Sequence, residues 1–469
     1  MKREFDLIIL GMGSTAASAG REARKLGKTV AYVEEGQVGG TCLNQGCVPS
    51  KFLIEAAKAF HRMKSPNFDA LSCTEPLLDF ERLIEQKDEI IVGYREAKEE
   101  KVLEEDDGIE LFRGTASFIG PRTIKVGEDI ELSGHRILIA TGAKPSIPDI
   151  EGLDSVDHMT SDLLSTRNGE ELRKLPESLI VVGGGYIALE LGQMFSRLGT
   201  RVTILERSSQ LLAHGYEPEL GDALGRCLEE EGVSVICDCE VLSVHTLQES
   251  GSVEVIVKVA GEERTSFNAE KLLVATGRDA NVERLALGNA GVELNSNGFI
   301  KVDRFLRTTR DGVFAAGDVI GKEQGNQMAT PVGVADGKIA VKNAFMDRVL
   351  EPLDHGIIPR AIFTEPEIAM VGYTTDQLNE EGIEYSVSYL SMASVPRAVY
   401  KQEKDGFIKL LVDSERKILG ATMFGASAGE VIQSIAFAMN FGADERDLIE
   451  QFYIYPTMAE SLKFVAAAK

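Results

Sequence analysis

The sequence of 469 residues lacks tryptophan, has only six cysteines and contains no long apolar run. A run of about 18 apolar residues is needed to cross a bilayer, so no transmembrane helix is expected. The chain enters an expected strand by residue 5, which also speaks against an N-terminal secretion signal. Six cysteines are too few for a secreted scaffold held by disulfides, and this favours a reducing, cytoplasmic location.

Positive charge is scarce as well. The chain has 50 Lys and Arg residues against 74 Asp and Glu residues, which gives a formal net charge of −24 at pH 7. Nucleic acid and anionic membrane surfaces are therefore not expected as partners. A hydrophobic content of 43% and a charged content of 26% are typical of a soluble globular protein. The length allows about two to four domains.

Two of the few cysteines, Cys42 and Cys47, are five positions apart in a Gly-rich stretch over 39–51. A fully extended chain would separate their Cα atoms by roughly 16 Å, whereas a disulfide needs about 4.4–6.8 Å. The segment must therefore coil, and we expect a helix N-terminus, which also lowers the pKa of a thiol. Such a pair can open and close a disulfide. The alternative is a structural disulfide or two buried thiols.

A nucleotide-binding fingerprint begins the chain. An apolar strand over 6–10 leads into Gly-x-Gly-x-x-Ala, formed by Gly11, Gly13 and Ala16, which opens a helix expected over 17–26. Gly11 suits a tight turn, Gly13 lets the backbone approach a pyrophosphate, and Ala16 permits close packing of helix and strand. The next strand ends at Glu34, whose carboxylate suits the hydroxyl pair of a ribose.

The same pattern occurs a second time. A strand over 178–182 leads into Gly183 and Gly185, and the following strand, over 201–205, ends at Glu206. One such fingerprint is weak evidence, because a Gly-rich turn need not bind anything. Two of them, each with strand, helix, second strand and terminal acid, predict two dinucleotide sites.

These motifs together resemble those of the flavoprotein disulfide reductases, the class I pyridine nucleotide-disulfide oxidoreductases. This family includes glutathione reductase, dihydrolipoamide dehydrogenase and mercuric reductase. The segments 140–142 and 275–278 resemble the strand ends where the chain passes between the FAD and NAD domains of the family. The segment 315–318 resembles its second flavin motif, and 360–373 resembles the start of its dimerisation domain.

The resemblance implies an α/β fold. Two Rossmann-like, doubly wound domains would bind FAD and NAD(P), and an α+β C-terminal domain would form a homodimer. The expected division is 1–152 for the FAD domain with the redox-active disulfide, interrupted by a polar helical hairpin over about 52–105. Residues 153–279 would bind NAD(P)H, 280–345 would return to the flavin, and 346–469 would form the dimerisation domain.

The resemblance also implies roles for the residues around the cysteine pair. Cys47 would be the thiolate beside the flavin and Cys42 the interchange thiol that faces the substrate. Lys51, one helical turn after Cys47, would lie near the flavin N5 atom and pair with Glu190. Tyr186 would cover the flavin until nicotinamide displaces it. The expected catalytic residues are Cys42, Cys47, Lys51, Tyr186, Glu190, Tyr455 and Glu460.

The cofactors implied are FAD and NADH or NADPH. NADH is slightly favoured, because the Glu206 carboxylate repels a 2′-phosphate, although Arg207 aligns with one phosphate-binding arginine of NADPH users. The second such arginine is replaced by Ala213. The expected FAD-binding residues are Gly11, Gly13, Ser14, Thr15, Ala16, Glu34, Gly40, Thr41, Cys42, Lys51, Gly114, Ala116, Thr141, Gly142, Asp318 and Thr330. Those expected for NAD(P)H are Gly183, Gly185, Tyr186, Ile187, Glu206, Arg207 and Gly277.

The C-terminal motif departs from that of most of the family. Glutathione reductase and dihydrolipoamide dehydrogenase use a His-Pro-Thr motif and a nearby glutamate, and the His moves the proton of the interchange thiol across the dimer. Here Tyr455 takes the place of the His, and Glu460 matches the supporting acid. A phenol with a pKa of about 10 is a poor proton carrier at neutral pH. None of the six histidines lies in a motif that would replace it.

Mercuric reductases have a tyrosine at this position, and the stretches 455–463 and 395–398 also resemble theirs. A soft Hg(II) ion suits thiolate ligands, so Cys42 and Cys47 would hold a metal ion transiently, as substrate. Their C-terminal Cys-Cys pair has no counterpart in 464–469. We expect a thiophilic acceptor such as Hg(II) or another metal ion. The alternatives are a disulfide reductase of the dihydrolipoamide dehydrogenase or glutathione reductase type, and a non-catalytic flavoprotein redox sensor.

Overall fold

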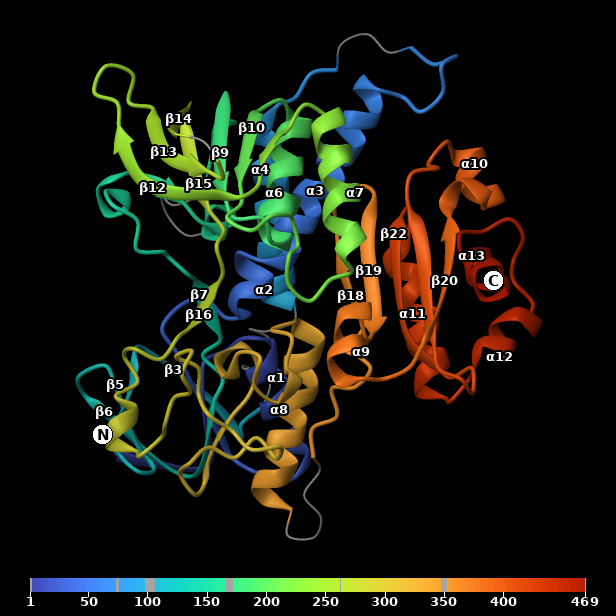
Figure 1. Cartoon of the computed structure of the whole chain (residues 1–469). Helices are drawn as coiled ribbons and strands as arrows, with labels where there is room; N and C mark the ends of the chain where they lie inside the picture. Colours follow the sequence, from blue (N-terminus) through green and yellow to red (C-terminus); the bar gives the residue numbers. More distant parts are fainter. Residues whose placement is uncertain are drawn as a thin grey trace.

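The computed structural model of the protein describes residues 2–72, 76–97, 106–165, 172–261, 263–346 and 352–468. Its strands form three main sheet regions, which lie next to one another in Figure 1. Residues of the first region, at the lower left in that view, come from both the start and the middle of the chain. Across the described ranges, no helix combines the length and apolar character needed to cross a bilayer.

The first region is built on a seven-stranded sheet with the order β3-β2-β1-β6-β5-β4, in which β17 also pairs with β6. The strands β3, β2, β1, β6 and β17 are parallel, and β4 and β5 form an antiparallel extension. The strands are β1 (Lys2–Leu10), β2 (Val30–Glu34), β3 (Ile109–Arg113), β4 (Ala116–Gly120), β5 (Thr123–Val126), β6 (Ile130–Ile139) and β17 (Val313–Ala315). The helices packed on it are α1 (Ser14–Lys25) and α8 (Thr330–Phe345).

The second region repeats the parallel plan, with the strand order β11-β10-β9-β15-β8. A three-stranded antiparallel sheet, β12-β13-β14, lies beside it. The strands are β8 (His158–Met159), β9 (Ser178–Val182), β10 (Arg201–Leu205), β11 (Ser234–Ile236), β12 (Cys239–Thr246), β13 (Val253–Val259), β14 (Arg264–Ala269) and β15 (Lys271–Val274). Its helices are α6 (Tyr186–Leu198) and α7 (Pro218–Glu230).

In both parallel sheets, a glycine at the end of the first strand, Gly11 or Gly183, makes the turn into the following helix. Gly11 and Gly183 both have a left-handed φ, +101° and +118°. A Cβ atom on either glycine would lie 2.5 Å from a carbonyl oxygen of the next parallel strand, that of Ala140 or Ala275. Only glycine avoids both the strain and the clash, so each fingerprint turns directly from strand into helix.

The chain crosses between these two regions twice, at neighbouring points. The strands β7 (Ala143–Pro145) and β16 (Arg278–Ala280) pair antiparallel between the regions (Figure 1). The side chains of Thr141 and Asn281 bond to each other's backbone: the Thr141 hydroxyl donates to the Asn281 carbonyl at 2.7 Å, and the Asn281 amide donates to the Thr141 carbonyl at 3.0 Å. The two connections between the regions are therefore hydrogen-bonded to each other.

Three helices carry the cysteine stretch and its continuation: α2 (Gly40–Asn44), α3 (Cys47–Lys64) and α4 (Phe80–Arg95). Asp79 caps α4 by accepting a hydrogen bond from the backbone N–H of Arg82 at 3.0 Å. α3 and α4 form the helical pair predicted over about 52–105, but α3 already begins at Cys47. Residues 98–105 of the predicted hairpin lie outside the described residues.

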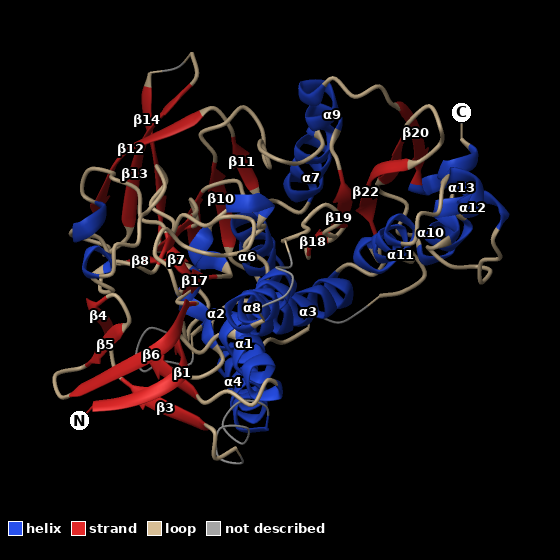
Figure 2. Ribbon diagram, turned by 90° about the horizontal axis from the view of Figure 1, so that it is seen from below, coloured by secondary structure: helices blue, strands red, loops and turns tan. Residues whose placement is uncertain are grey.

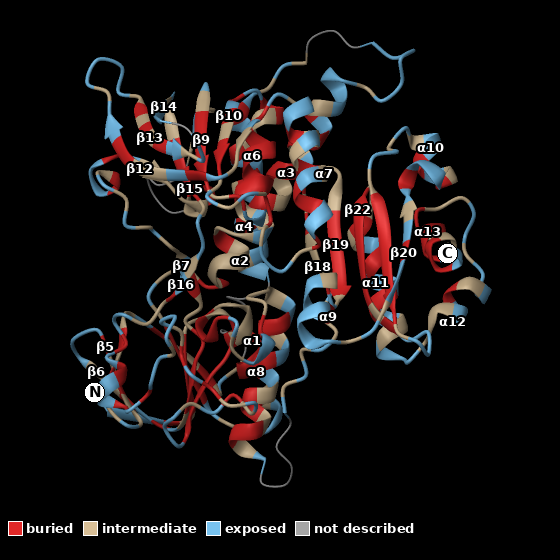
Figure 3. Cartoon of the chain, in the orientation of Figure 1, coloured by how far each residue is buried: buried red, intermediate tan, exposed pale blue. Residues whose placement is uncertain are grey.

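The third region contains a five-stranded antiparallel sheet with the order β18-β19-β22-β21-β20. One face is covered by α11 and α13, and the other packs its apolar residues against α3 and α6. All six residues of β21 are buried (Figure 3). The elements are β18 (Arg360–Ile362), β19 (Glu367–Gly372), α9 (Thr375–Glu381), β20 (Ser386–Ser391), α10 (Pro396–Lys401), β21 (Phe407–Val412), β22 (Ile418–Gly425), α11 (Ala428–Asn440), α12 (Glu445–Glu450) and α13 (Glu460–Ala467).

Candidate active site

The two cysteines of the Gly-rich stretch lie on two successive helices. Cys42 is inside the short α2, and Cys47 is the first residue of α3, after a break at Gln45 and Gly46. We predicted a single helix start, but the backbone turns between the cysteines. A Cβ atom at Gly46 would lie 2.9 Å from the Thr41 carbonyl oxygen and 3.3 Å from the Cys42 Cα atom. The absence of a side chain at Gly46 therefore lets α3 begin directly beside Cys42.

Both thiols are free in the structure, and their pKa values move in opposite directions. A hydrogen bond from Cys42, opposed by burial and assisted by the charge of Lys51, lowers the pKa of Cys47 to about 6. The same hydrogen bond, and then burial, raises the pKa of Cys42. The Thr330 hydroxyl lies 3.9 Å from the Cys47 sulfur and also favours the thiolate. In the reduced pair, Cys47 is the thiolate at pH 7 and Cys42 keeps its proton.

Lys51 and Glu190 meet across the interface between α3 and α6. The Lys51 Nζ atom lies 2.7 Å from Glu190 Oε2, and the Glu190 side chain is only 4% exposed. The other carboxylate oxygen accepts a hydrogen bond from the Phe363 backbone N–H at 2.9 Å. The Lys51 amine also lies 4.8 Å from the centre of the Phe363 ring. The predicted contact between Lys51 and Glu190 is present, whereas no sequence motif indicated that Phe363 would contact both residues.

Tyr186 is the first residue of α6 and directly follows Gly185 of the second fingerprint. Its side chain is 41% exposed, yet the protein around it raises the pKa of the phenol to about 12, chiefly by desolvation. Tyr216 and Arg360 lie nearby, and the Arg360 guanidinium is 4.8 Å from the centre of the Tyr216 ring. Neither residue was singled out in the sequence: Tyr216 lies in no recognised motif, and Arg360 lies in the 360–373 segment, which was assigned to the dimerisation domain.

The start of α1 has the form of a dinucleotide site. Gly13 and Gly40 approach each other so closely that a Cβ atom on Gly40 would lie 2.6 Å from the Gly13 Cα atom. The first turn of α1 carries no acidic residue and no side-chain cap. Its backbone N–H groups therefore remain available for an anionic group such as a pyrophosphate.

Backbone N–H groups bind the two acids, Glu34 and Glu206, that lie at the end of the second strand of each fingerprint. Glu34 accepts hydrogen bonds from the backbone N–H groups of Met12 and Gly36, both at 2.7 Å. Glu206 accepts one from the N–H of Ser208 at 2.6 Å. Backbone donors fix both carboxylates at the carboxyl ends of parallel strands, where a ribose is bound in this type of fold. Arg207 lies beside Glu206 and is exposed.

Asp318 lies in the segment expected to be the second flavin motif. It follows Gly317, where a Cβ atom would lie 2.5 Å from the Thr15 hydroxyl oxygen, so the second flavin motif packs against α1. Within the described residues, the half-buried Asp318 carboxylate has no hydrogen-bond donor, and burial raises its pKa. A polyol hydroxyl would supply the missing donor. The residues present therefore fit FAD.

Other predicted FAD-binding residues lie close to those just described. Gly114 follows β3, and its N–H donates to the Glu34 carbonyl at 3.0 Å. Ala116 begins β4 and is buried. Ser14 and Ala16 lie in the first turn of α1, and Gly142 precedes β7. Gly185 and Ile187, predicted for NAD(P)H, flank Tyr186 at the start of α6, and Gly277 precedes β16.

Tyr455 and Glu460 lie far from the cysteine pair of their own chain. Tyr455 precedes α13 and Glu460 is its first residue, and α12 and α13 are distant from α2 in both Figure 1 and Figure 2. The Tyr455 side chain is 65% exposed, and its hydroxyl lies 3.4 Å from that of Tyr400. Glu460 is nearly buried and accepts a hydrogen bond from the Thr457 N–H at 3.2 Å. The structure of one chain does not bring these residues together with Cys42.

Other cysteines and one histidine lie away from the cysteine pair in the sequence. Cys237 and Cys239 have the alternating spacing of a strand but do not share one, because Asp238 between them has a φ of +50° and β12 begins only at Cys239. Cys73 lies outside the described residues. His355 lies in the loop before β18, and its side chain is nearly buried and pairs with Asp336 at 2.9 Å. Among the residues described, no group of three or more His, Cys, Asp or Glu could hold a metal ion.

The comparisons with known proteins agree with this geometry. Residues 5–337 match the pyridine nucleotide-disulphide oxidoreductase family, and residues 358–466 match the dimerisation domain of that family. The chain therefore belongs to the pyridine nucleotide-disulphide oxidoreductases. Its fold, with two Rossmann-like domains and a C-terminal dimerisation domain, is confirmed.

The similar proteins are reductases. The chain is 37% identical to the mercuric reductase of Lysinibacillus sphaericus, over 98% of this chain and 82% of that protein. It is 38% identical to the mercuric reductase of Staphylococcus aureus, over 99% of this chain and 82% of that protein. A solved Cu(II) complex of the HOCl-induced flavoprotein disulfide reductase RclA from Escherichia coli aligns with a TM-score of 0.86 at 28% identity, covering 99% of both chains.

These matches establish the class of activity. The protein is an FAD-dependent NAD(P)H oxidoreductase of the flavoprotein disulfide reductase type, as predicted. The pair Cys42 and Cys47 stands where this chemistry needs a redox-active disulfide.

Proposed function

We propose that the protein reduces a thiophilic oxidant, Hg(II) or another soft metal ion, at Cys42 and Cys47 with electrons from NADH or NADPH. The observation that carries this proposal is the pair of adjacent thiols with opposed pKa values, one of them a thiolate at neutral pH. Thiolates are the ligands that soft metal ions prefer. Relatives named as mercuric reductases and a neighbour solved as a Cu(II) complex support the same acceptor class.

The residues around the pair suit this task. When bound, a flavin supplies the two-electron chemistry that links a reduced nicotinamide to a disulfide. Cys47 would hold the thiolate on the flavin side, and Cys42 would offer its sulfur to the acceptor. Lys51, kept in place by Glu190, would stabilise negative charge on both the thiolate and the flavin ring. Oxidation of the two thiolates to a Cys42–Cys47 disulfide would release two electrons, which convert one Hg(II) to Hg(0), and electrons from NADH or NADPH would then reduce the disulfide again.

We further propose the residues that bind the cofactors. The first fingerprint, Glu34, the 114–116 and 141–142 segments, Asp318 and Thr330 would hold FAD. Gly183, Gly185, Ile187, Glu206, Arg207 and Gly277 would hold the nicotinamide nucleotide, with Tyr186 as the ring that nicotinamide displaces. Glu206, held by a backbone N–H at 2.6 Å, supports NADH, and the exposed Arg207 beside it leaves room for NADPH.

We also propose a cytoplasmic homodimer. The match to a dimerisation domain supports the dimer, and so does the distance of Tyr455 from the cysteine pair of its own chain. In the dimer, Tyr455 and Glu460 of one protomer would complete the acceptor site of its partner. The division of the chain into 1–152, 153–279, 280–345 and 346–469 remains our proposal for its domains.

Steady-state and stopped-flow assays with a panel of acceptors test the proposal. The panel contains Hg(II), Cu(II), lipoamide, glutathione disulfide and a quinone, each with NADH and with NADPH, and the variants Cys42→Ser and Cys47→Ser. We expect metal-dependent oxidation of the nicotinamide that both variants abolish. Preference for lipoamide or glutathione disulfide would instead indicate a disulfide reductase. A flavoprotein that turns over with no acceptor would be a redox sensor, and turnover that survives both substitutions would refute the cysteine mechanism.

A further inference from the structure

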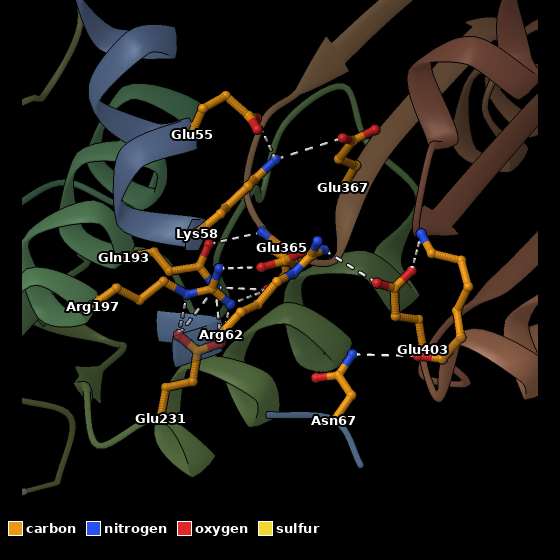
Figure 4. Close-up of polar contacts among 11 residues, drawn as sticks. Glu55, Lys58, Arg62, Asn67, Gln193, Arg197, Glu231, Glu365, Glu367 and Glu403 are labelled. Atoms are coloured by element: carbon orange, nitrogen blue, oxygen red, sulfur yellow. Dashed lines mark hydrogen bonds and ion pairs between the residues drawn. The ribbon is translucent and has the colours of Figure 1, made fainter. Parts of the chain in front are cut away.

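One face of α6 makes successive contacts with the turn that joins β18 to β19, residues 363–366 (Figure 4). The contacting side chains are Glu190, Gln193 and Arg197, which are spaced three and four positions apart and so lie on the same face. All three are nearly buried, with exposed fractions of 4%, 3% and 6%. The helix that carries Glu190 is thus fastened along its length to a segment of the third region.

Gln193 binds both backbone groups of one residue. Its Oε1 atom accepts a hydrogen bond from the Glu365 N–H at 2.8 Å, and its Nε2 atom donates to the Glu365 carbonyl at 2.7 Å. A side-chain amide that meets a peptide group in this way fixes its position in two directions. Gln193 therefore sets where the 363–366 turn lies relative to α6.

Arg197 binds two carboxylates, one on each side. It donates to Glu231 from Nε at 2.8 Å and from Nη2 at 2.6 Å, and its Nη1 atom bonds to the Glu365 carboxylate. Burial alone would raise the pKa of Glu365, but the charges and hydrogen bonds of Arg197 and Arg62 lower it overall. The Glu365 carboxylate is therefore held in its charged form between Arg197 and Arg62.

The helix α3 reaches the same turn from the other side. Lys51, Lys58 and Arg62 are spaced seven and four positions apart on one face of α3. Lys51 pairs with Glu190 at 2.7 Å, Lys58 with Glu367 at 3.6 Å, and Arg62 with Glu365. Figure 4 shows Lys58 beside Glu367 and Arg62 beside Glu365. The helix that begins with Cys47 is thus tied at several points to the 363–366 turn and its flanks.

Phe363 connects this turn to the active site. Its N–H donates to Glu190 at 2.9 Å, and the centre of its ring lies 4.8 Å from the Lys51 amine. A displacement of the turn would remove a donor from Glu190 and a neighbour from Lys51 in one movement. Lys51 would be free to turn toward water. Glu190 would lose the Phe363 N–H, which compensates part of its negative charge. Both changes disfavour a thiolate at Cys47.

We propose that Gln193 and Arg197 are positioning residues for the Lys51–Glu190 pair, and that they keep Lys51 beside Cys47 by fixing the 363–366 turn. The inference rests on the proposed function, since it assigns Lys51 a part in stabilising the Cys47 thiolate. It extends that function to residues that touch neither the cysteines nor a nucleotide.

A second buried ion pair provides a matched control. Lys409 of β21 bonds to Glu217, next to the start of α7, at 2.8 Å, and both side chains are at most 5% exposed. This pair also joins the second and third regions, but neither residue bonds to the 363–366 turn. The variant Lys409→Met therefore weakens the same contact between regions without the link to Lys51.

The test measures the pKa of Cys47 directly in the flavin-loaded protein with the cysteine pair reduced. The charge-transfer absorbance between the Cys47 thiolate and the flavin is titrated between pH 4.5 and 9, and thermal unfolding is recorded for each variant. In the unaltered protein this absorbance should reach half its maximum near the Cys47 pKa of about 6. In Gln193→Leu that midpoint should rise by about one pH unit, which leaves roughly fivefold less thiolate at pH 6.

Further variants locate the effect. Arg197→Lys keeps the charge but loses the bidentate contact, so it should raise the midpoint in the same direction by a smaller amount. Glu365→Gln keeps the backbone contacts with Gln193, so it should shift the midpoint of the Cys47 titration least. Lys409→Met should lower the unfolding temperature and leave the midpoint unchanged.

Two outcomes overturn the inference. One is an unchanged midpoint in Gln193→Leu and Arg197→Lys. The other is an equal shift in Lys409→Met, because the effect would then be a general loosening of the regions. The variant Lys51→Met separates this failure from that of the proposed function. If Lys51→Met raises the midpoint and the α6 variants do not, only the positioning role is wrong; if Lys51→Met has no effect, the assigned role of Lys51 is wrong.

Discussion

Cys42 and Cys47 have the same side chain and differ only in what surrounds them. Cys47 begins α3, receives a hydrogen bond from Cys42 and has Lys51 one turn away, and its pKa falls to about 6. Cys42 gives that hydrogen bond and is partly buried, and its pKa rises. The division of labour between the two sulfurs is therefore built by their neighbours, and a change at a neighbour alters it.

Tyr455 offers a direct test at the residue scale. In the proposed dimer its phenol stands where relatives with disulfide substrates have an imidazole, and a phenol with a pKa of 10 or more does not exchange protons readily at neutral pH. We expect Tyr455→His to raise the rate of lipoamide or glutathione disulfide reduction by about 10²-fold, the usual scale of general acid–base catalysis. The measurement is kcat/KM for each disulfide between pH 6 and 9.

The matched control for this substitution is Tyr455→Phe. It removes the hydroxyl, which lies 3.4 Å from that of Tyr400, without adding a group that titrates near neutral pH. It should leave disulfide reduction at its low starting level. If Tyr455→His gives no gain with any disulfide, the proton-transfer argument fails.

At this scale the sequence was informative where a residue acts through its own side chain. The spacing of Cys47 and Lys51, and the match of Glu190 to a family motif, led to a contact that the structure contains. Phe363 could not be found in that way, because its hydrogen bond to Glu190 comes from a backbone N–H that almost every residue has. The role of such a residue depends on its position in space and has no signature in the sequence.

Among the elements, the parallel strands were the most predictable. The expected strands over 178–182 and 201–205 coincide with β9 and β10, because strands buried on both faces are continuous apolar runs between glycine and charged residues. The break between α2 and α3 was missed. Its cause is the close packing of Gly46 on Thr41, a contact that depends on the fold around it.

The contact between α8 and the loop before β18 predicts a pH-dependent stability. Asp336 of α8 is fully buried and pairs with His355 at 2.9 Å, and this bond raises the pKa of His355 above its ordinary value of 6.5. Asp354 acts in the same direction, and burial opposes both. A raised pKa means that the folded protein binds the proton more tightly than the unfolded chain does, so the pair stabilises most below pH 6.5.

We therefore expect His355→Gln to lower the free energy of unfolding by about 2 kcal/mol at pH 5.5, the scale of a hydrogen bond to a charged group. The loss should shrink as the pH rises through the pKa of His355 in the folded protein. Urea unfolding of both proteins between pH 5 and 9 measures the difference. A difference that is constant over this range, or larger at high pH, would contradict the assignment.

Over the whole molecule, apolar side chains are exposed together on the third region. Phe437 of α11 and Phe441, which follows the helix, stack with ring centres 6.4 Å apart, and Phe452 and Ile454, close to Tyr455 in the sequence, are at least 80% exposed. Exposed aromatic groups of this kind are common at the centres of protein interfaces. The exposure of Phe452 and Ile454 next to Tyr455 agrees with a dimer in which Tyr455 reaches the partner.

We expect Phe441→Glu to weaken dimerisation by about 2 kcal/mol or more, roughly thirtyfold in Kd. Sedimentation velocity over a concentration series measures this, and metal-dependent turnover should fall in parallel with the dimer fraction. Leu77, which is 95% exposed next to α4, supplies the control variant Leu77→Glu, which should leave both unchanged. A Phe441→Glu monomer with full turnover would contradict a site shared between protomers.

The order of the regions could be predicted from the sequence, because each region begins with a local motif. The contacts that join the regions could not be predicted from the sequence. Gln193 and Glu365 are 172 positions apart, and glutamine and glutamate are ordinary residues at a helix face and in a turn. Only the folded chain shows that they bind each other.

The paired crossing strands have a consequence for how this chain can be altered. The Ser146 N–H donates to the Gly277 carbonyl at 2.9 Å, so the second region leaves and rejoins the remainder of the chain at nearly one point. A segment whose ends meet in this way behaves as an insert and can be exchanged as a unit while the host keeps its connectivity. Such an exchange would replace Glu206 and Arg207 together, and it would leave the cysteine pair undisturbed only where the new segment keeps the α6 residues that hold Lys51.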